Sequence, residues 1–338
     1  MQNDTLSPLC PRIGITHGDF NGVGYEVILK TFEDARILTL LTPVLYGQSK
    51  VFSYYKKNFG IADFSYSLTR DARQAWSQKF NILNIVEDKL DIDPGKVTDL
   101  AGLMAVVSLE KGVDDLRNGH VDGLVLAPAN PLNMKRDRYA YANQQQYLDA
   151  AFGAASSMLI LVSDRVKIGM LTSHLPLREA LEAVTTERVL QGIRGFAMSL
   201  KNDFGITAPK IAVLGLNPHA GMSEAFGREE VSLIEPALLQ ARNEDVFAFG
   251  PFAADTFFGS DAWLKYDGVL AMYHDQAMVP FQLLSAQGGA YCFSGLPAVC
   301  TAPVMECQYD LANQNVANPD AFRKALYLAC DIVRQRAR

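Results

Sequence analysis

Residues 12–30 read RIGITHGDFNGVGYEVILK. Their order, an apolar run, a turn and an amphipathic stretch, recurs along the chain. The apolar run Arg12–Thr16 predicts a buried strand, and the amphipathic stretch that begins near Tyr25 predicts a helix. A glycine-rich turn joins the two, as expected for a tight strand-to-helix connection. The turn lacks the GxGxxG spacing, so it is weak evidence for a dinucleotide site.

Strand and helix patterns alternate from this unit to the C-terminus, and several apolar runs are continuous, which is typical of strands covered on both faces. The expected strands are Arg12–Thr16, Pro43–Tyr46, Asn81–Ile85, Gly123–Ala127, Ser157–Val162, Lys167–Thr172, Lys210–Leu216, Phe247–Gly250 and Gly268–Met272. The expected helices include Leu100–Asn118, Thr186–Leu200, Glu229–Ala241 and Pro319–Arg336. This alternation predicts an α/β fold with a largely parallel sheet.

Length, charge and cysteine content exclude several classes of protein. A chain of 338 residues suggests two domains at about 150 residues each. The net charge of −6 argues against nucleic-acid binding, which needs a basic surface. Five cysteines without a CxxC pair indicate a reducing, cytoplasmic compartment. Neither a signal peptide nor an apolar run of about 18 residues is present, so we expect no membrane contact.

Four of the five histidines follow expected strands: His17, His174, His219 and His274. In parallel α/β sheets, ligands bind at the carboxyl ends of the strands, so these side chains could converge on one site. Imidazole suits Zn, Co, Ni or Fe, and a three-histidine site leaves positions open for a substrate. A single such histidine is more often structural, and the spacing lacks HExxH compactness. The fifth, His120, is expected to lie at a helix C-terminus.

Two carboxylates could complete a catalytic site. Asp275 directly follows His274, and Asp255 lies in a short polar segment, Ala254–Thr256. Either carboxylate could act as a general base or orient a metal-bound histidine. The alternative for each is an ordinary helix N-cap. His219 lies between Pro218 and Gly221, which restrict the direction of its ring.

Eight motifs occur in the order of a known family. They are Ile13–Glu26, Ala127–Asn130, Thr172–Pro176, Gly215–Gly221, Phe226–Glu230, Gly250–Thr256, Ala271–Gln276 and Gly295–Pro297. Through them the chain resembles the 4-hydroxythreonine-4-phosphate dehydrogenase family of vitamin B6 (pyridoxine) biosynthesis, from about residue 12 to the C-terminus. The Asn-Pro-His-Ala-Gly and Met-Tyr-His-Asp-Gln motifs are the most specific.

The resemblance implies an isocitrate/isopropylmalate-dehydrogenase-like fold of two α/β domains with the active site in the cleft between them. It implies a homodimer that oxidises a hydroxy acid with NAD and releases CO2. A divalent metal (Zn, Co or Mg) would bind His174, His219 and His274, one of them from the partner subunit. Asp275 or Asp255 would accept or relay the hydroxyl proton. We expect a first domain of residues 1–140 and 285–338, and a second, 141–284, that carries the metal histidines and the dimer interface.

The positions that bind substrate in this family are changed here. Pro131 and Gln282 each replace a lysine of the family, Tyr291 replaces an asparagine, and Cys300 replaces an arginine. The family's Gly-His-Thr-Glu is Asn143–Gln146 here, which includes Gln144 and Gln145, and its His-Gly-Thr-Ala is Met305–Gln308. Each lost charge-assisted hydrogen bond contributes about 1.5–3 kcal/mol to binding.

Several functions therefore remain open. One is oxidative decarboxylation of 4-hydroxythreonine 4-phosphate or a related hydroxy acid. Another is a changed, unphosphorylated substrate, and a third is a non-catalytic relative that only binds a ligand. A metal-assisted hydrolase with Asp275 as its base ranks last, because no nucleophile accompanies the histidines.

Overall fold

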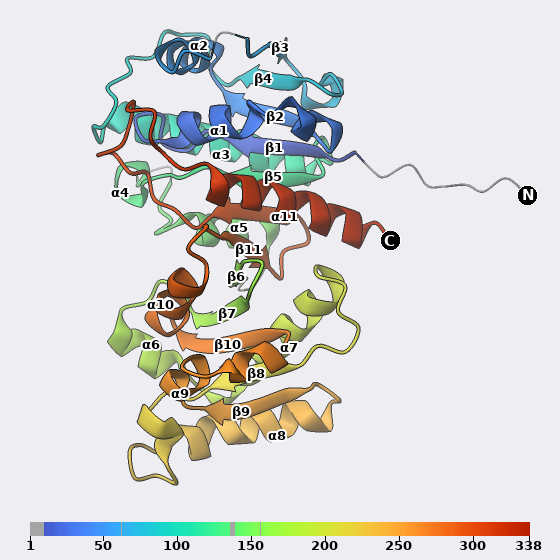
Figure 1. Ribbon diagram of the computed structural model, residues 1–338, viewed down its shortest axis with the longest axis vertical. Helices are drawn as coiled ribbons and strands as arrows, with labels where there is room; N and C mark the ends of the chain where they lie inside the picture. Colours follow the sequence, from blue (N-terminus) through green and yellow to red (C-terminus); the bar gives the residue numbers. More distant parts are fainter. Residues whose placement is uncertain (1–9, 62, 136–138, 156) are drawn as a thin grey trace, which may run out of the picture. The chain divides into compact units, whose positions relative to one another are not determined.

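A computed structural model describes residues 10–61, 63–135, 139–155 and 157–338. The chain divides into two compact units, which are both drawn in Figure 1. Unit 1 contains the described residues up to Ala155 together with Leu296–Arg338, and unit 2 contains those of Ser156–Gly295. The first unit is therefore discontinuous in sequence. The assignment of the metal histidines and the dimer interface to a second domain stays a prediction.

Unit 1 is a parallel sheet covered by helices. Its elements are β1 (Arg12–Thr16), α1 (Gly24–Phe32), η1 (Ala35–Thr39), β2 (Thr42–Gly47), α2 (Ser49–Asn58), β3 (Tyr66–Thr69), η2 (Ala72–Gln74), β4 (Phe80–Asn84), α3 (Asp99–Arg117), β5 (Gly123–Leu126), α4 (Pro131–Met134), α5 (Gln144–Phe152), β12 (Val299–Pro303) and α11 (Asp320–Arg336). The strand order is β3-β4-β2-β1-β5-β12. Every neighbouring pair in this order is parallel.

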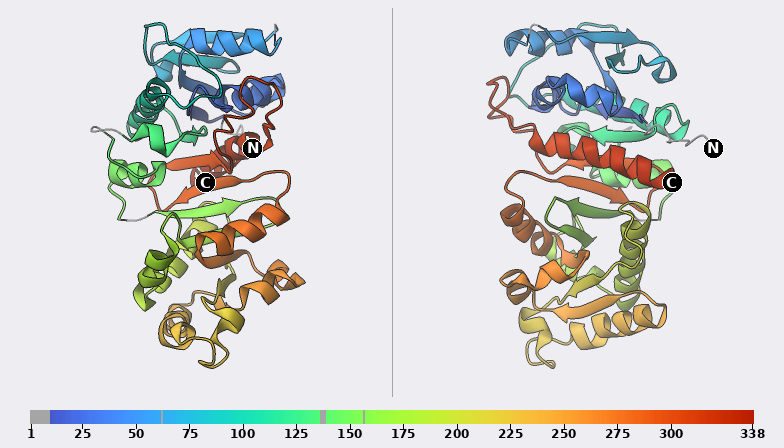
Figure 2. Two further views of the ribbon diagram at one scale, coloured as in Figure 1. Left: turned by 90° about the vertical axis from the view of Figure 1, so that its left-hand side faces the viewer. Right: turned by 45° about the vertical axis from the view of Figure 1, so that its right-hand side comes forward.

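Helices lie on both faces of this sheet, as continuous apolar strands require. Figures 1 and 2 show α3 on one face and α1 and α11 on the other. The helix α3 packs on β1, β2 and β5, while α11 packs on β5 and β12. All residues of β2 and β5 are buried, so the core of unit 1 runs along both faces of the sheet.

Unit 2 has a mixed sheet. Its elements are β6 (Met158–Val162), β7 (Lys167–Thr172), α6 (Leu177–Ala183), α7 (Thr186–Asn202), β8 (Ile211–Leu214), η3 (Pro218–Gly221), η4 (Glu230–Ile234), α8 (Glu235–Asn243), β9 (Ala248–Phe252), α9 (Ala254–Phe258), η5 (Asp261–Lys265), β10 (Gly268–Tyr273), α10 (His274–Leu284) and β11 (Ala290–Ser294). The strand order is β11-β6-β7-β10-β8-β9. The pairs β11–β6 and β6–β7 are antiparallel, and the others are parallel.

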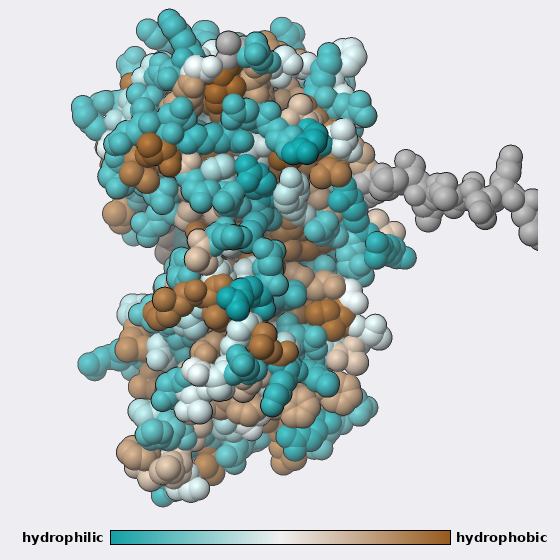
Figure 3. Space-filling view, in the orientation of Figure 1, coloured by the Kyte–Doolittle hydropathy of each residue, from teal (hydrophilic) through white to brown (hydrophobic). Residues whose placement is uncertain are grey.

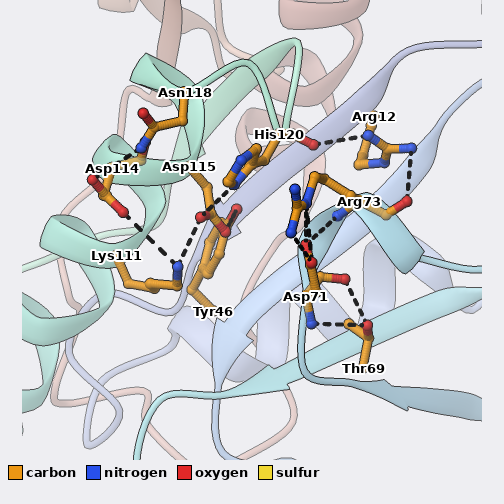
Figure 4. A network of polar contacts seen from close by, with 10 residues as sticks. All are labelled: Arg12, Tyr46, Thr69, Asp71, Arg73, Lys111, Asp114, Asp115, Asn118 and His120. Carbon is orange, nitrogen blue, oxygen red and sulfur yellow. Dashed lines mark hydrogen bonds and ion pairs between the residues drawn. The ribbon is translucent and has the colours of Figure 1, made fainter.

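A polar network joins the end of α3 to the sheet of unit 1 (Figure 4). The Asp115 carboxylate accepts hydrogen bonds from the Tyr46 hydroxyl at 3.0 Å and the Lys111 ammonium at 2.7 Å. The His120 ring nitrogen Nδ1 lies 3.1 Å from the same carboxylate. His120 thus lies just beyond the C-terminus of α3, as expected, and its contacts are structural.

The structure confirms the expected α/β alternation. The expected helix over Glu229–Ala241 is present, and its first part, η4, is a π-helical turn that passes directly into α8. Three strands, β3, β11 and β12, were not expected from the sequence pattern. No helix in the described part of the chain is both long and apolar enough to cross a membrane.

Candidate functional site

Three neighbouring parallel strands of unit 2, β7, β10 and β8, each lead into a histidine. His174 follows β7 by two residues, His274 is the first residue of α10 after β10, and His219 lies in η3 after β8. The Thr172 hydroxyl donates to the Met272 carbonyl oxygen at 2.7 Å, which joins the ends of β7 and β10. The carboxyl edge of this sheet therefore carries all three expected metal ligands.

The structure brings His174 and His274 together. Their ring centroids are 5.8 Å apart. Partial burial, and secondly the neighbouring His274, lower the pKa of His174 below its usual value of 6.5. Nδ1 of His274 lies 2.8 Å from the Asp275 carboxylate. If that nitrogen donates its proton to Asp275, the other ring nitrogen is left with the lone pair that a metal requires.

This donor set fits a divalent metal of the zinc and cobalt type. A lowered pKa keeps the His174 imidazole neutral at neutral pH, and only a neutral imidazole can bind a metal. A carboxylate hydrogen-bonded to a histidine is a common orienting partner in metal sites. The pair supplies two donors. Across the described ranges of the chain, no group of three or more His, Cys, Asp or Glu side chains lies close enough to bind one ion.

His219 lies on a loop with an unusual backbone. His219 and Ala220 have φ angles of 57° and 50°, in the left-handed region. Residues with a Cβ rarely adopt this conformation, so other contacts must hold the loop. The Glu230 carboxylate accepts the backbone N–H groups of Leu216 and Asn217, each at 2.7 Å. The His219 ring also packs against Phe226, with centroids 5.3 Å apart.

The two candidate carboxylates lie in the first turns of α10 and α9. Asp275 is the second residue of α10, and the position before that helix is Tyr273, so the N-cap alternative is wrong for Asp275. Asp255 is exposed in the first turn of α9, which follows Ala253 at the N-cap position. The helix α9 packs against η3, the element that carries His219.

His17, the fourth histidine at a strand end, lies in unit 1. It is fully buried and stacks on Tyr25, with ring centroids 5.6 Å apart. Burial lowers its pKa to about 4. A neutral, enclosed ring of this kind is a core residue. The expectation that all four histidines at strand ends could converge on one site is therefore wrong for His17.

The changed substrate positions lie on several elements. Gln144 and Gln145 begin α5, Gln282 is exposed on α10, and Tyr291 is half-buried in β11. Cys300 is buried in β12, and burial raises the pKa of its thiol to about 12. None of these side chains carries a positive charge.

Sequence reasoning did not identify Glu230 and Gln276 as site residues. The Gln276 amide accepts from the Met272 N–H and donates to the Gly215 carbonyl oxygen, both at 2.7 Å. Glu230 ends the motif Phe226–Glu230 and Gln276 ends the motif Ala271–Gln276. The residue types alone do not distinguish a buried, hydrogen-bonded side chain from one on a polar helix surface. Their position next to the histidine motifs was the only available signal.

The fold is that of dehydrogenases. The crystal structure of 4-hydroxythreonine-4-phosphate dehydrogenase from Klebsiella pneumoniae matches with a TM-score of 0.82 at 25% identity, covering 97% of this chain and 99% of that chain. Isocitrate dehydrogenase from Methylococcus capsulatus shares the fold, with a TM-score of 0.51 at 10% identity over 97% of this chain and 87% of that chain. The chain is a dehydrogenase of the class that acts on a CH–OH group.

The family follows from the sequence matches. The model of the family "Pyridoxal phosphate biosynthetic protein PdxA" matches residues 39–329. A 4-hydroxythreonine-4-phosphate dehydrogenase of Bacteroides thetaiotaomicron is 38% identical, over 97% of this chain and 90% of that protein. A Cutibacterium acnes protein with the provisional name D-threonate 4-phosphate dehydrogenase is 30% identical, over 97% and 95%. The chain therefore belongs to the PdxA family.

Proposed function

We propose that this chain is a metal-dependent, NAD-linked dehydrogenase that oxidises 4-hydroxythreonine 4-phosphate or a related hydroxy acid and releases CO2. The observation that carries the proposal is the pair His174 and His274, with Asp275 against the second ring, at the carboxyl edge of the sheet in unit 2. In a member of a dehydrogenase family, this is where a hydroxyl-polarising ion would be expected.

Each residue has a distinct part in the proposed reaction. His174 and His274 would hold the ion, and His219 would complete the donor set from the second copy of a homodimer. When bound, a divalent ion polarises the substrate hydroxyl. Asp275 keeps the His274 ring in one orientation, because its carboxylate lies 2.8 Å from Nδ1. Asp255 is exposed and next to η3, so it would enter the site from the second copy together with His219, and it is then the better candidate to accept the hydroxyl proton.

Exposed apolar side chains on the two helices that follow His174 and His274 support the homodimer. The helices α6 and α10 start at or just after His174 and His274, and they carry Leu177 and Leu283, which are 67% and 78% exposed. Figure 3 shows apolar surface over α10 on the face in view. Apolar side chains gathered on one face are typical of a protein interface. We propose that this face contacts the second copy and brings the third histidine to the pair.

A second candidate is the same chemistry on an unphosphorylated hydroxy acid. The observation that favours it is the absence of positive charge at Gln282 and Cys300, where the family resemblance expects cations. A phosphate binds best where charged donors surround it. The Cutibacterium acnes relative carries a different substrate in its name, which supports variation of substrate within the family.

The formation of NADH tests both candidates. The protein is supplied with NAD and Zn²⁺, Co²⁺ or Mg²⁺, and with 4-hydroxythreonine 4-phosphate, D-threonate 4-phosphate or the unphosphorylated form of each. We expect metal-dependent NADH formation with at least one of these, and its loss in His274→Ala. Faster turnover of the unphosphorylated acids supports the second candidate. A protein that binds metal but reduces no NAD with any of them contradicts the proposed function.

A further inference from the structure

Glu230 is a buried carboxylate devoted to the His219 loop. It is 1% exposed. One of its oxygens, Oε1, accepts the N–H groups of Leu216 and Asn217, and the other, Oε2, accepts the Asn217 side-chain amide at 2.9 Å. A carboxylate is placed in a protein interior only when hydrogen bonds replace its lost hydration. Here those bonds are all made with the two residues that lead into the loop.

The loop is shaped around this carboxylate. A Cβ atom on Gly221 would lie 2.7 Å from Glu230 Oε2, and one on Gly215 would lie 3.1 Å from Oε1. The glycines at the two ends of the loop therefore leave the space that the carboxylate fills. Between them, His219 and Ala220 keep left-handed backbone angles. Backbone hydrogen bonds from Ala220 N–H to the Asn217 carbonyl oxygen and from Met222 N–H to the His219 carbonyl oxygen close the turn, and the carboxylate satisfies the N–H groups of Leu216 and Asn217 that precede it.

A π-helical turn aims Glu230 at the loop. The turn, η4, begins at Glu230 and passes into α8 at Glu235. Such a turn contains one residue more than an α-helical turn, and it changes the direction of the side chains at its start. Glu229, the residue before this turn, also reaches the loop, with its carboxylate 2.7 Å from the Asn217 amide nitrogen.

Gln276 joins the loop to the second histidine element. Its side-chain oxygen accepts the Met272 N–H at the end of β10, and its side-chain nitrogen donates to the Gly215 carbonyl oxygen after β8. Gln276 lies in the first turn of α10, two residues after His274. A single amide, acting as donor and acceptor, thus connects the start of the His274 helix to the base of the His219 loop.

We propose that Glu230 and Gln276 are positioning residues for the metal-binding histidines: Glu230 fixes the shape of the His219 loop, and Gln276 ties the base of that loop to the end of β10, so that the loop can present His219 to the histidine pair of the second copy. This rests on the proposed function, in which these histidines bind the metal. In this role neither residue would contact the substrate or the ion. Orienting groups behind metal ligands commonly contribute roughly 10- to 100-fold to metal affinity.

The test uses two nearly isosteric variants and a matched control. Gln276→Glu removes the donor that faces the Gly215 carbonyl oxygen, and Glu230→Gln replaces one acceptor that faces the Asn217 amide with a donor. Asp203→Asn is the control, because Asp203 is also a buried carboxylate of unit 2, bonded to the Ser199 hydroxyl at 2.6 Å. Asp203 lies ahead of β8, at the opposite end of that strand from the His219 loop.

Two readouts separate positioning from general stability. The first is amide hydrogen exchange of residues 215–222 in the metal-free protein, and the second is the affinity for Co²⁺ followed by its visible absorption. We expect faster amide exchange of the loop and roughly 10- to 100-fold weaker Co²⁺ binding in both Glu230→Gln and Gln276→Glu. We expect neither change in Asp203→Asn, even where its Tm falls as far. Should Glu230→Gln fail to fold, Gln276→Glu still tests the proposal, because Gln276 holds the base of the same loop at Gly215.

Folded Glu230→Gln and Gln276→Glu variants with unchanged loop exchange and unchanged Co²⁺ affinity would overturn the proposal. A wild-type protein that binds no Co²⁺ contradicts the proposed function and removes the role in metal binding. In that case, the exchange measurement still reports whether Glu230 and Gln276 hold the His219 loop in place, so the two failures are distinguishable.

Discussion

At the scale of single residues, His17 couples the stability of unit 1 to pH. Burial lowers its pKa from 6.5 to about 4. Between these values the unfolded chain binds a proton that the folded chain does not, so stability present above pH 6.5 is lost as the pH falls toward 4. The shift corresponds to about 3 kcal/mol.

We expect His17→Phe, which can still stack on Tyr25, to remove this part of the acid sensitivity. Urea unfolding of wild type and variant at several values between pH 6.5 and pH 4 measures it. The wild type should lose about 3 kcal/mol more than the variant over that range. Equal losses in the two proteins would mean that His17 titrates as it does in the unfolded chain.

The sequence located some site residues and not others, for physical reasons. His174 and His274 were found because parallel strands end at one edge of a sheet. The role of Glu230 was not found, because it depends on a π-helical turn, and an extra residue in a helix leaves no periodic pattern. Gln276 was missed because a buried amide and an exposed one look alike in sequence.

At the scale of elements, Asp115 anchors the end of α3. Its carboxylate is 2% exposed and pairs with Tyr46, Lys111 and His120 (Figure 4). We expect Asp115→Ala to lower the free energy of unfolding by about 2–3 kcal/mol, because the buried Tyr46 hydroxyl loses its acceptor. Asp114→Ala is the control: its side chain is 63% exposed, so a change below about 0.5 kcal/mol is expected. Similar losses in both variants would refute the anchoring role.

Replacing either of two helical glycines with alanine is expected to have opposite effects on stability. A Cβ on Gly102 in α3 would lie 2.0 Å from the Asn133 carbonyl oxygen, a backbone atom that cannot easily move. A Cβ on Gly195 in α7 would have no neighbour within 4 Å. Thermal unfolding should therefore show a clear loss of stability for Gly102→Ala. Gly195→Ala should gain about 1 kcal/mol from helix propensity. A stabilised Gly102→Ala would show that α3 and α4 are packed less closely than described.

The strands that the sequence did not predict share weak signals. The strand β3 is short, lies at the edge of the unit 1 sheet, and alternates little between buried and exposed residues. The strands β11 (AYCFS) and β12 (VCTAP) are only five residues long, and each contains alanine or proline, which are depleted in strands. Tertiary packing, which propensity does not describe, determines these three strands. The long helices α3, α7 and α11 were predicted to within a few residues, because their periodic patterns extend over several turns.

At the scale of the whole molecule, the proposed homodimer makes a direct prediction. Leu283→Asp places a charge on an exposed apolar position of α10, the helix that begins at His274, and it should shift the protein toward monomer in sedimentation. Leu239→Asp on α8 is the control, since Leu239 is also exposed, at 59%, but does not lie on α6 or α10. A wild type that sediments as a monomer at all concentrations would refute the shared metal site.

The most direct test of the account is the bound metal, measured by elemental analysis after dialysis against Zn²⁺, Co²⁺ or Mg²⁺. We predict about one equivalent per chain in wild type and in His120→Ala, whose ring contacts Asp115 in unit 1. We predict its loss in His174→Ala, His219→Ala and His274→Ala. Wild-type protein that retains no metal, or a His274→Ala variant that retains as much as wild type, would contradict the assignment of these histidines.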